Sequence, residues 1–260
     1  MDAIRISREG PITTVTLDRP QVRNAFNETL IAELTGAFSS IDEHCRVVIL
    51  TGNGNVFCAG ADINWMKKSI SDTQEQNARD ADAMARMFRA IDECPKPVVG
   101  RINGHALGGG MGLVACCDVA LAVDTALFGF TEVRLGIVPA VISPFALRAI
   151  GTRAARRYFL TGERFDAATA HDLGLVHAVA AAGALDTATE AITHALLKCG
   201  PNAVTVAKQL IREVPAMDAV TAHRHTVETT ARARTSPEGQ DGLGAFLEKR
   251  NPRWLSADTQ

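Results

Sequence analysis

The stretch Ile102-Asn103-Gly104-His105-Ala106-Leu107-Gly108-Gly109-Gly110-Met111-Gly112 decides the fold, because it joins two apolar runs through an almost bare backbone. The runs are residues 97–102 before it and residues 113–117 after it. We therefore predict a strand, a tight turn and a buried helix that begins near Gly109. Glycine loses the most conformational freedom on folding, so this density indicates a place that something approaches closely. The free N–H groups of a helix start would grip an oxygen that carries or develops negative charge there.

The length, composition and charge of the chain limit the classes of protein to which it can belong. The chain has 260 residues, 47% of them hydrophobic, and a formal net charge of −2, which predicts one large domain with or without an appendage. That charge gives no general attraction to nucleic acid or to anionic membranes. No apolar run reaches the length of a transmembrane helix, and the N-terminus does not resemble a signal peptide, so we expect a cytoplasmic protein. The cysteines lack C-x-x-C spacing and the histidines lack zinc spacing, so we expect reduced thiols and no metal.

Strand and helix patterns alternate along the first two thirds of the chain. Strands are expected at 12–17, 47–50, 97–102 and 118–123, with a brief extended piece at 174–176. A helix follows Asn27, a good N-cap, and runs to about Ile41. This alternation predicts an α/β fold. From about Pro144 the chain becomes helical and rich in alanine. A change of composition near residue 195 divides it into a core, 1–195, and a helical region, 196–260, which we expect to pack on a neighbouring subunit.

A second bare turn, Cys58-Ala59-Gly60-Ala61-Asp62, also follows an apolar run. If the strands before the two turns are neighbours in a sheet, both turns lie at one edge and two backbone N–H groups converge on one oxygen. That arrangement is an oxyanion hole. Two alternatives stay open: the glycines only permit tight packing, or Gly110-x-Gly112-x-x-Ala115 is a dinucleotide fingerprint, although a lone match is weak evidence.

Glu132 is the candidate catalytic acid or base, because its neighbours from Phe128 to Val133 are mostly apolar. Partial burial would raise the pKa of this carboxyl toward the range useful for proton transfer. The alternative is an ion pair with Arg134 or Arg148. The chain has no G-x-S-x-G elbow and no P-loop, so acyl-enzyme chemistry and phosphoryl transfer lack support.

These motifs together resemble the crotonase superfamily, also called the enoyl-CoA hydratase/isomerase family. The resemblance covers nearly the whole chain and rests on Leu17-Asp18-Arg19-Pro20, Asn24-Ala25, residues 57–63, Asn103-Gly104, Gly109-Gly110, Cys117-Asp118, Phe128-Gly129, Glu132, Leu135-Gly136, Pro139, Gly239 and residues 246–250. It implies a spiral of ββα units with a helical C-terminal trimerisation region, in a homotrimer or a dimer of trimers. It implies an acyl-CoA thioester as substrate, with coenzyme A entering only as part of that substrate and no separate cofactor.

The resemblance also assigns roles. The N–H groups of Ala61 and Gly109 would hold the thioester oxygen while an enolate forms, and Glu132 would be one of two catalytic glutamates. The remaining assignments concern coenzyme A: backbone contacts to the adenine from Ala59 and Ile63, a basic side chain near the phosphates at Arg23, and contacts to a neighbouring subunit's coenzyme A from Phe246 and Lys249.

The chain departs from the family at the second glutamate, whose position falls on Gly112. Either Glu132 does more, or another group such as Glu163 or His105 holds the water. A Δ3,Δ2-enoyl-CoA isomerase needs only one base, so that activity is the alternative to hydration, and other CoA-thioester chemistry stays open. A binding protein for RNA or a partner, using arginines 148, 153, 156 and 157, is disfavoured by the near-neutral charge.

A narrower resemblance bears on the substrate. Residues 131–145, 154–158 and 236–240 look similar to the bacterial methylglutaconyl-CoA hydratases and their carboxygeranoyl-CoA relatives, which serve leucine and acyclic-terpene breakdown. Glycine at position 112 is not foreign to that group. We therefore expect a hydratase of a branched 2-enoyl-CoA, with an acyl pocket formed by Trp65, Met66, Val141 and Phe145.

Overall fold

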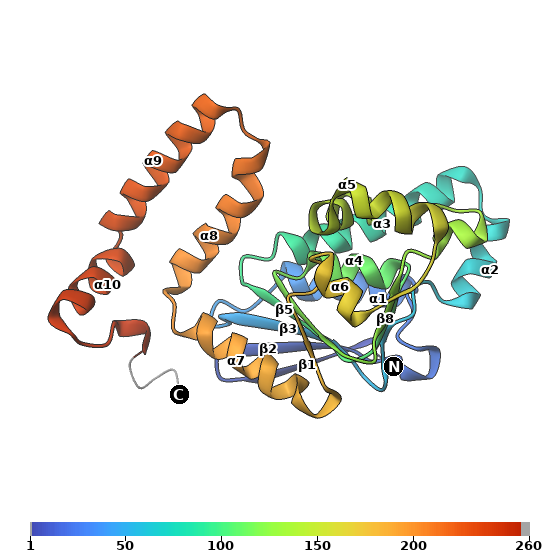
Figure 1. Ribbon diagram of the computed structural model, residues 1–260, viewed down its shortest axis with the longest axis horizontal. Helices are drawn as coiled ribbons and strands as arrows, with labels where there is room; N and C mark the ends of the chain where they lie inside the picture. Colours follow the sequence, from blue (N-terminus) through green and yellow to red (C-terminus); the bar gives the residue numbers. More distant parts are fainter. Residues whose placement is uncertain (1, 256–260) are drawn as a thin grey trace.

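The chain forms two sheets in the computed structural model, which describes residues 2–255 (Figure 1). The larger sheet has the order β1 (Ile4–Glu9), β2 (Ile12–Leu17), β3 (Val47–Gly52), β5 (Val98–Ile102), β7 (Val119–Val123), β10 (Ala178–Ala180). Its first pair is antiparallel and the other pairs are parallel. The smaller sheet has the order β4 (Val56–Cys58), β6 (His105–Leu107), β8 (Leu127–Gly129), β9 (Phe165–Asp166). Only β9 runs antiparallel to its neighbour there.

One unit repeats along the chain: a strand of the larger sheet, a strand of the smaller sheet, and then helix. The units are β3, β4, α2 (Ile63–Ser71) and α3 (Gln74–Asp92); β5, β6 and α4 (Gly109–Cys116); β7, β8 and α5 (Ser143–Thr161). Parallel neighbours need such crossovers, because a short hairpin joins only antiparallel strands. The predicted α/β class with ββα units is confirmed, and each unit delivers one turn to the same edge of the smaller sheet.

Several helices begin where the sequence provides a side-chain cap. Asn27 accepts a hydrogen bond of 2.9 Å from the Leu30 N–H at the start of α1 (Glu28–Ser39). Thr73 and Gln76 form a capping box at the start of α3. Leu30 and Leu34 of α1 and Phe88 of α3 are fully buried, so both of these helices are held by an apolar face as well as by a cap.

Helices cover both faces of the larger sheet. Figure 1 shows α1, α3, α4 and α5 on one side, while α7 (Leu185–Leu197) packs on β5 and β7. The strands between these layers are apolar almost throughout, and Val48, Leu50 and Val98 are fully buried. The short elements are α6 (Ala167–Asp172) and 3₁₀ turns at Pro20–Val22, Glu132–Leu135, Ala182–Ala184, Val214–Ala216 and Arg253–Leu255.

A helical arm leaves the core after α7. Figure 1 shows α8 (Pro201–Glu213), α9 (Ala219–Thr235) and α10 (Pro237–Glu248) extending away from the sheets. Lys208 of α8 is tied to Asp118 at the start of β7 by an ion pair of 2.7 Å. Because α7 continues to Leu197, the predicted division at 195/196 falls inside a helix, and it stays a prediction. Within residues 2–255 no helix is both long enough and apolar enough to cross a bilayer.

Two local predictions differ from the structure. The strand Ile4–Glu9 was not expected, because five of its six residues are exposed and it pairs only with β2. The extended piece expected at 174–176 is wrong: Gly174 lies in a turn at φ 78°, and the strand follows at Ala178–Ala180. Leu175 and Val176 are buried without pairing in the sheet.

Candidate active site

The two bare turns meet, because β4 and β6 are parallel neighbours with Val56 opposite His105 and Cys58 opposite Ala106. Gly60 has φ 91° and Gly108 has φ 51°, a region that side chains other than glycine rarely adopt. A Cβ atom at Gly60 would lie 3.1 Å from the Leu107 carbonyl oxygen and 3.7 Å from Gly108 Cα. The turns are therefore in direct contact. The strand that leads into the second turn is β6, and not the strand expected at 97–102.

Phe26 fixes the direction of the first turn. Its N–H donates to the Gly60 carbonyl at 2.7 Å, and its carbonyl accepts from the Asp62 N–H at 2.9 Å. This is a parallel bridge to Ala61, so the N–H of Ala61 itself points away from Phe26. That N–H has no acceptor within residues 2–255, and Ala61 lines a cavity.

The second donor is the N–H of Gly109, the first residue of α4. The first N–H groups of a helix have no acceptor inside the helix. Gly108 N–H instead donates to the Gly129 carbonyl at 2.9 Å, which fixes the turn against β8. A Cβ at Gly109 would lie 2.9 Å from the Phe26 ring, so only glycine lets α4 begin this close to the first turn. Ala61 and Gly109 line the same cavity with free N–H groups, the arrangement that an oxyanion hole requires.

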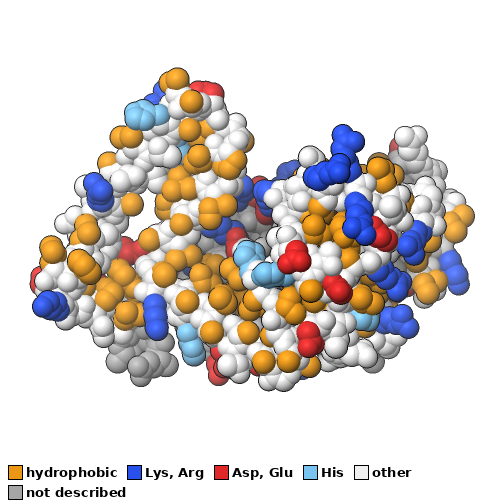
Figure 2. Space-filling view, in the orientation of Figure 1, with side chains coloured by type: hydrophobic (Ala, Val, Ile, Leu, Met, Phe, Trp, Pro, Cys, Tyr) orange, Lys and Arg blue, Asp and Glu red, His pale blue; other side chains and the backbone are white. Residues whose placement is uncertain are grey.

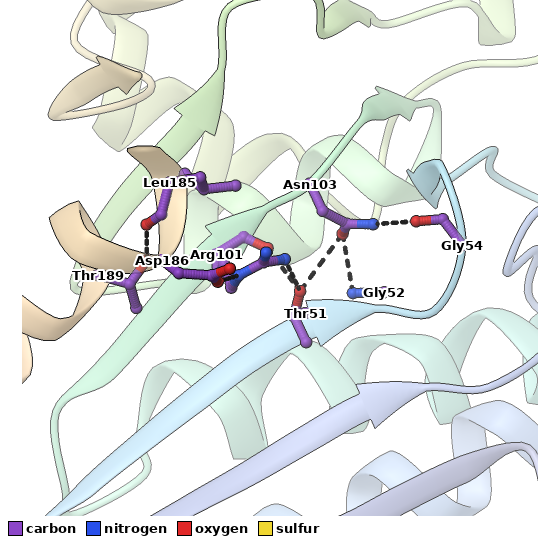
Figure 3. A network of polar contacts seen from close by, with 8 residues as sticks. All are labelled: Thr51, Gly52, Gly54, Arg101, Asn103, Leu185, Asp186 and Thr189. Carbon is purple, nitrogen blue, oxygen red and sulfur yellow. Dashed lines mark hydrogen bonds and ion pairs between the residues drawn. The ribbon is translucent and has the colours of Figure 1, made fainter. Parts of the chain in front are cut away.

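Asn103 holds the strands in register behind these turns (Figure 3). Its side-chain oxygen accepts from the Gly52 N–H at 3.0 Å, and its amide donates to the Gly54 carbonyl at 2.8 Å. These bonds tie the end of β5 to the loop that enters β4. A Cβ at Gly104 would lie 2.2 Å from the Asn55 carbonyl oxygen, so the two loops touch backbone to backbone. The glycine-rich stretch therefore positions both strands from which the donors emerge.

The cavity has a volume of about 340 Å³ and a mainly apolar wall. Trp65 and Met66 of α2 and Val141 line it, as expected for an acyl pocket. Phe145 does not; its ring packs beside Phe88, with centroids 6.0 Å apart. The wall is formed by Phe26, Ala59, Gly60, Ala61, Trp65, Met66, Ser69, Asn77, Asp80, Ala81, Met84, Gly108, Gly109, Thr131, Glu132, Leu135 and residues 137–142.

Glu132 opens the 3₁₀ turn after β8 and lies beside the second bare turn, since a Cβ at Gly108 would be 3.6 Å from its Oε1. Burial raises the pKa of this carboxyl above its usual value. Its Oε2 is buried and has no hydrogen-bond partner among the described residues. Arg148 pairs with Asp92 instead, so the ion-pair alternative fails for that arginine. The structure therefore places an unpartnered carboxyl with a raised pKa in a mainly apolar wall.

Gly112 is closed to a side chain. A Cβ there would lie 2.5 Å from Ile142 Cγ2 and 2.7 Å from Phe88 Cε1. It faces packed core, and it is not among the residues that line the cavity. The two proposed substitutes lie elsewhere too: His105 Nδ1 accepts from the Leu127 N–H at 3.0 Å inside the smaller sheet, and Glu163 pairs with Arg157.

The residues expected to contact coenzyme A fall in two places. The Ala59 N–H donates to the Arg23 carbonyl at 3.0 Å, and Ile63, 66% exposed, follows at the start of α2. These three therefore form one rim next to the first bare turn, residues 58–62. Phe246 and Lys249 lie on the arm, are exposed, and do not line this cavity.

Three residues in or beside the site were given no role from the sequence. Phe26 follows the Asn24-Ala25 motif directly, which is the one signal for its role. Asp80 lies four residues before Met84 on the cavity face of α3, a spacing that marks one helix face. Arg19 pairs with Asp62 at 2.9 Å, and Asp62 in turn caps α2 through the Asn64 N–H.

Comparison with known proteins decides the family. The profile described as enoyl-CoA hydratase/isomerase matches residues 7–257. The chain belongs to the enoyl-CoA hydratase/isomerase family. Its family relatives include the 2,3-dehydroadipyl-CoA hydratase of Escherichia coli, 32% identical over 263 residues, covering 97% of this chain and 98% of the relative. As a member of this hydratase class, the chain is an enzyme acting on acyl-CoA thioesters.

Solved structures of the family agree with the fold. An enoyl-CoA hydratase from Shewanella pealeana is 41% identical, with a TM-score of 0.92 over 97% of this chain and 96% of that chain. Pseudomonas aeruginosa AtuE is 34% identical, with a TM-score of 0.94 over 97% of this chain and 99% of that chain. The enoyl-CoA hydratase/isomerase fold therefore extends over nearly the whole chain, arm included.

Proposed function

We propose that this enzyme adds water to a branched 2-enoyl-CoA, of the methylglutaconyl-CoA type in its carbon skeleton. One observation carries the proposal: the free N–H groups of Ala61 and Gly109 and the unpartnered carboxylate of Glu132 line one apolar cavity. The branched skeleton is supported by the resemblance of residues 131–145, which supply much of the cavity wall. The name of the Escherichia coli relative, a dehydroadipyl-CoA hydratase, indicates that the acyl group varies within the family.

The residues divide the reaction as follows. Glu132 takes a proton from water while the water oxygen bonds to C3, and the electrons of the double bond move onto the thioester oxygen. Ala61 and Gly109 donate to that oxygen as its charge grows, an effect worth about 3–4 kcal/mol for each such donor. Protonated Glu132 then delivers its proton to C2 and the enolate collapses. The sum is a 3-hydroxyacyl-CoA with no group left on the enzyme.

The coenzyme A portion is assigned to the rim. Arg23, Ala59 and Ile63 would hold the adenine and phosphates, while Phe246 and Lys249 of a neighbouring copy would complete that site. A homotrimer or a dimer of trimers is supported by the apolar side chains that the arm exposes (Figure 2), among them Ile211, Val220, Phe246 and Leu247 at 75–82%. Light scattering on the purified enzyme tests this assembly, and a monomer at micromolar concentration would contradict it.

A Δ3,Δ2-enoyl-CoA isomerase is the second candidate, favoured by the closed position at Gly112, since moving a proton from C2 to C4 needs one base. Solvent oxygen separates the two. In H₂¹⁸O, hydration of 3-methylglutaconyl-CoA or another branched 2-enoyl-CoA places the heavy oxygen on C3 of the product. Isomerisation of a 3-enoyl-CoA incorporates none, so turnover without the label would overturn the hydratase proposal.

A further inference from the structure

The cavity contains a second carboxylate that the sequence did not single out. Among its described lining residues, Glu132 and Asp80 are the ionisable ones, and none is lysine, arginine or histidine. Glu132 comes from the 3₁₀ turn after β8 and Asp80 from α3, so the two carboxylates are delivered to one apolar space by separate elements. The family position for a second acid, Gly112, is closed by Phe88 and Ile142.

Asp80 is not engaged in holding the fold. Within residues 2–255 its carboxylate has no hydrogen bond and no ion pair, although its side chain is half-buried. Its charge acts on Lys68, whose pKa Glu28 and Asp80 both raise. Lys68 is already bonded to Glu28 at 2.6 Å. Because the Asp80 carboxylate forms no bond that holds the fold and lines the cavity, a function there is a better account of this residue than a structural role.

The other polar side chains of the described wall are uncharged, so each is a weaker acceptor than a carboxylate. The amide of Asn77 donates to the carbonyls of Ser69, Asp72 and Thr73, each at 3.2 Å, where it closes the end of α2. Trp65 Nε1 is buried without a hydrogen-bond partner among the described residues and can only donate. Together with the unpartnered Glu132 Oε2, the wall offers a free donor and free acceptors, the pattern that a bound water satisfies.

We infer that Asp80 is the second acid of this site and holds the water that Glu132 deprotonates. The inference rests on the proposed hydration. Asp80 accepts a hydrogen bond from one hydrogen of the water and does not take it; this hydrogen stays on the oxygen as the product's hydroxyl. Glu132 takes the other proton and passes it to C2. A carboxylate from α3 thus replaces the one that Gly112 and its packed surroundings exclude.

The test compares Asp80→Asn with Asp82→Asn, which makes the same change on the same helix at a side chain that is 61% exposed and paired with Arg86. We expect Asp80→Asn to lower kcat for water addition about tenfold to a hundredfold. Its KM, its affinity for an unreactive saturated acyl-CoA and its melting temperature should stay close to those of the unchanged enzyme. Asp80→Glu should recover part of kcat, and Asp82→Asn should lose none.

The outcomes separate this inference from the proposed function. Normal kcat in Asp80→Asn, or a loss matched by an equal loss of affinity for the saturated acyl-CoA, would overturn the role of Asp80 while leaving the hydratase proposal intact. A fall in melting temperature with no recovery in Asp80→Glu would also overturn it, because it indicates a structural residue. Turnover by the unchanged enzyme without ¹⁸O in the product contradicts the proposed function itself.

Discussion

A Cβ atom at Gly112 would lie 2.5 Å from Ile142 Cγ2, closer than real Cβ atoms approach a neighbour. The absence of a second glutamate is therefore built into the packing around α4, where Phe88 and Ile142 occupy the space that its side chain would need. A glutamate at this position would have to displace Phe88 and Ile142, and Ile142 is itself part of the cavity wall.

The first prediction follows from this contact. Gly112→Glu should lower the free energy of unfolding by more than about 2 kcal/mol, since it overpacks a core position and adds a charge there, and it should not raise the rate of water addition. Gly36→Ala is the matched control, because a Cβ at Gly36 of α1 meets nothing within 4 Å; it should gain about 0.5–1 kcal/mol. Urea unfolding measures both, and a stable, faster Gly112→Glu enzyme would contradict the closed position.

The second prediction concerns the pH dependence of kcat/KM. The ionised form of Glu132 accepts the proton, and burial raises its pKa, so kcat/KM should fall on acidification at a pH above the ordinary glutamate value of about 4.3. Glu132→Gln should lose about a hundredfold or more in kcat while it keeps its affinity for coenzyme A. If the residual kcat/KM of Glu132→Gln fell on acidification over the same pH range, the titrating group would be a residue other than Glu132.

The third prediction concerns stability at the same residue. The folded-state pKa of Glu132 lies above its unfolded value, so the folded protein binds the proton more tightly and loses stability as the pH rises from below the unfolded pKa through the folded one. Glu132→Gln removes that cost. Near neutral pH it should unfold at a temperature equal to or higher than the unchanged enzyme, and the difference should shrink below about pH 4. A clearly lower melting temperature at neutral pH would show that the carboxylate supports the fold.

The fourth prediction concerns Arg19 and Asp62, whose side chains are 15% and 7% exposed. Burial alone would raise the pKa of Asp62, but hydrogen bonds from the Asn64 N–H and from Arg19 outweigh it and hold the pKa below its usual value. The carboxylate therefore contributes stability above its unfolded pKa that is lost as the pH falls through the folded one.

Arg19→Ala should cost about 2 kcal/mol or more near neutral pH, because it leaves a buried charge uncompensated. It should also lower kcat, because Asp62 follows Ala61 directly and the turn loses its anchor. Arg86→Ala is the control: it breaks the exposed pair with Asp82 and should cost no more than about 1 kcal/mol. Equal losses in the two variants would show that Arg19 does not hold the oxyanion turn.

Much of the fold was predictable where local chemistry decides it. Asn27 caps α1 as expected, the apolar runs at 47–50 and 98–102 are central strands, and α4 begins at Gly109. The smaller sheet was not predictable, because its strands β4, β6 and β8 have three residues each and show no periodicity. Such strands exist only through pairing with segments far away in the sequence.

The candidate site also contains residues that were predictable from the sequence and others that were not. Bare turns are visible in a sequence, so two converging backbone donors were predictable from the residues, and the family resemblance assigned them to Ala61 and Gly109. The apolar neighbours of Glu132 indicate its burial. Asp80 was not predictable, because a lone aspartate on a polar helix face looks solvated. Only the folded structure, in which α3 packs against α4, shows that the part of α3 around Asp80 borders the cavity.

Phe26 touches both turns: its backbone brackets Ala61 and its ring packs on Gly109. A fully buried side chain thus acts as the spacer that sets the separation of the two donors before any thioester arrives. Hydrophobic cores usually accept exchanges among leucine, isoleucine and phenylalanine with modest loss. At Phe26, a substitution that barely changes the melting temperature would still shift one N–H donor relative to the other. The rate of enolate formation would therefore detect a change in core packing that a melting curve does not.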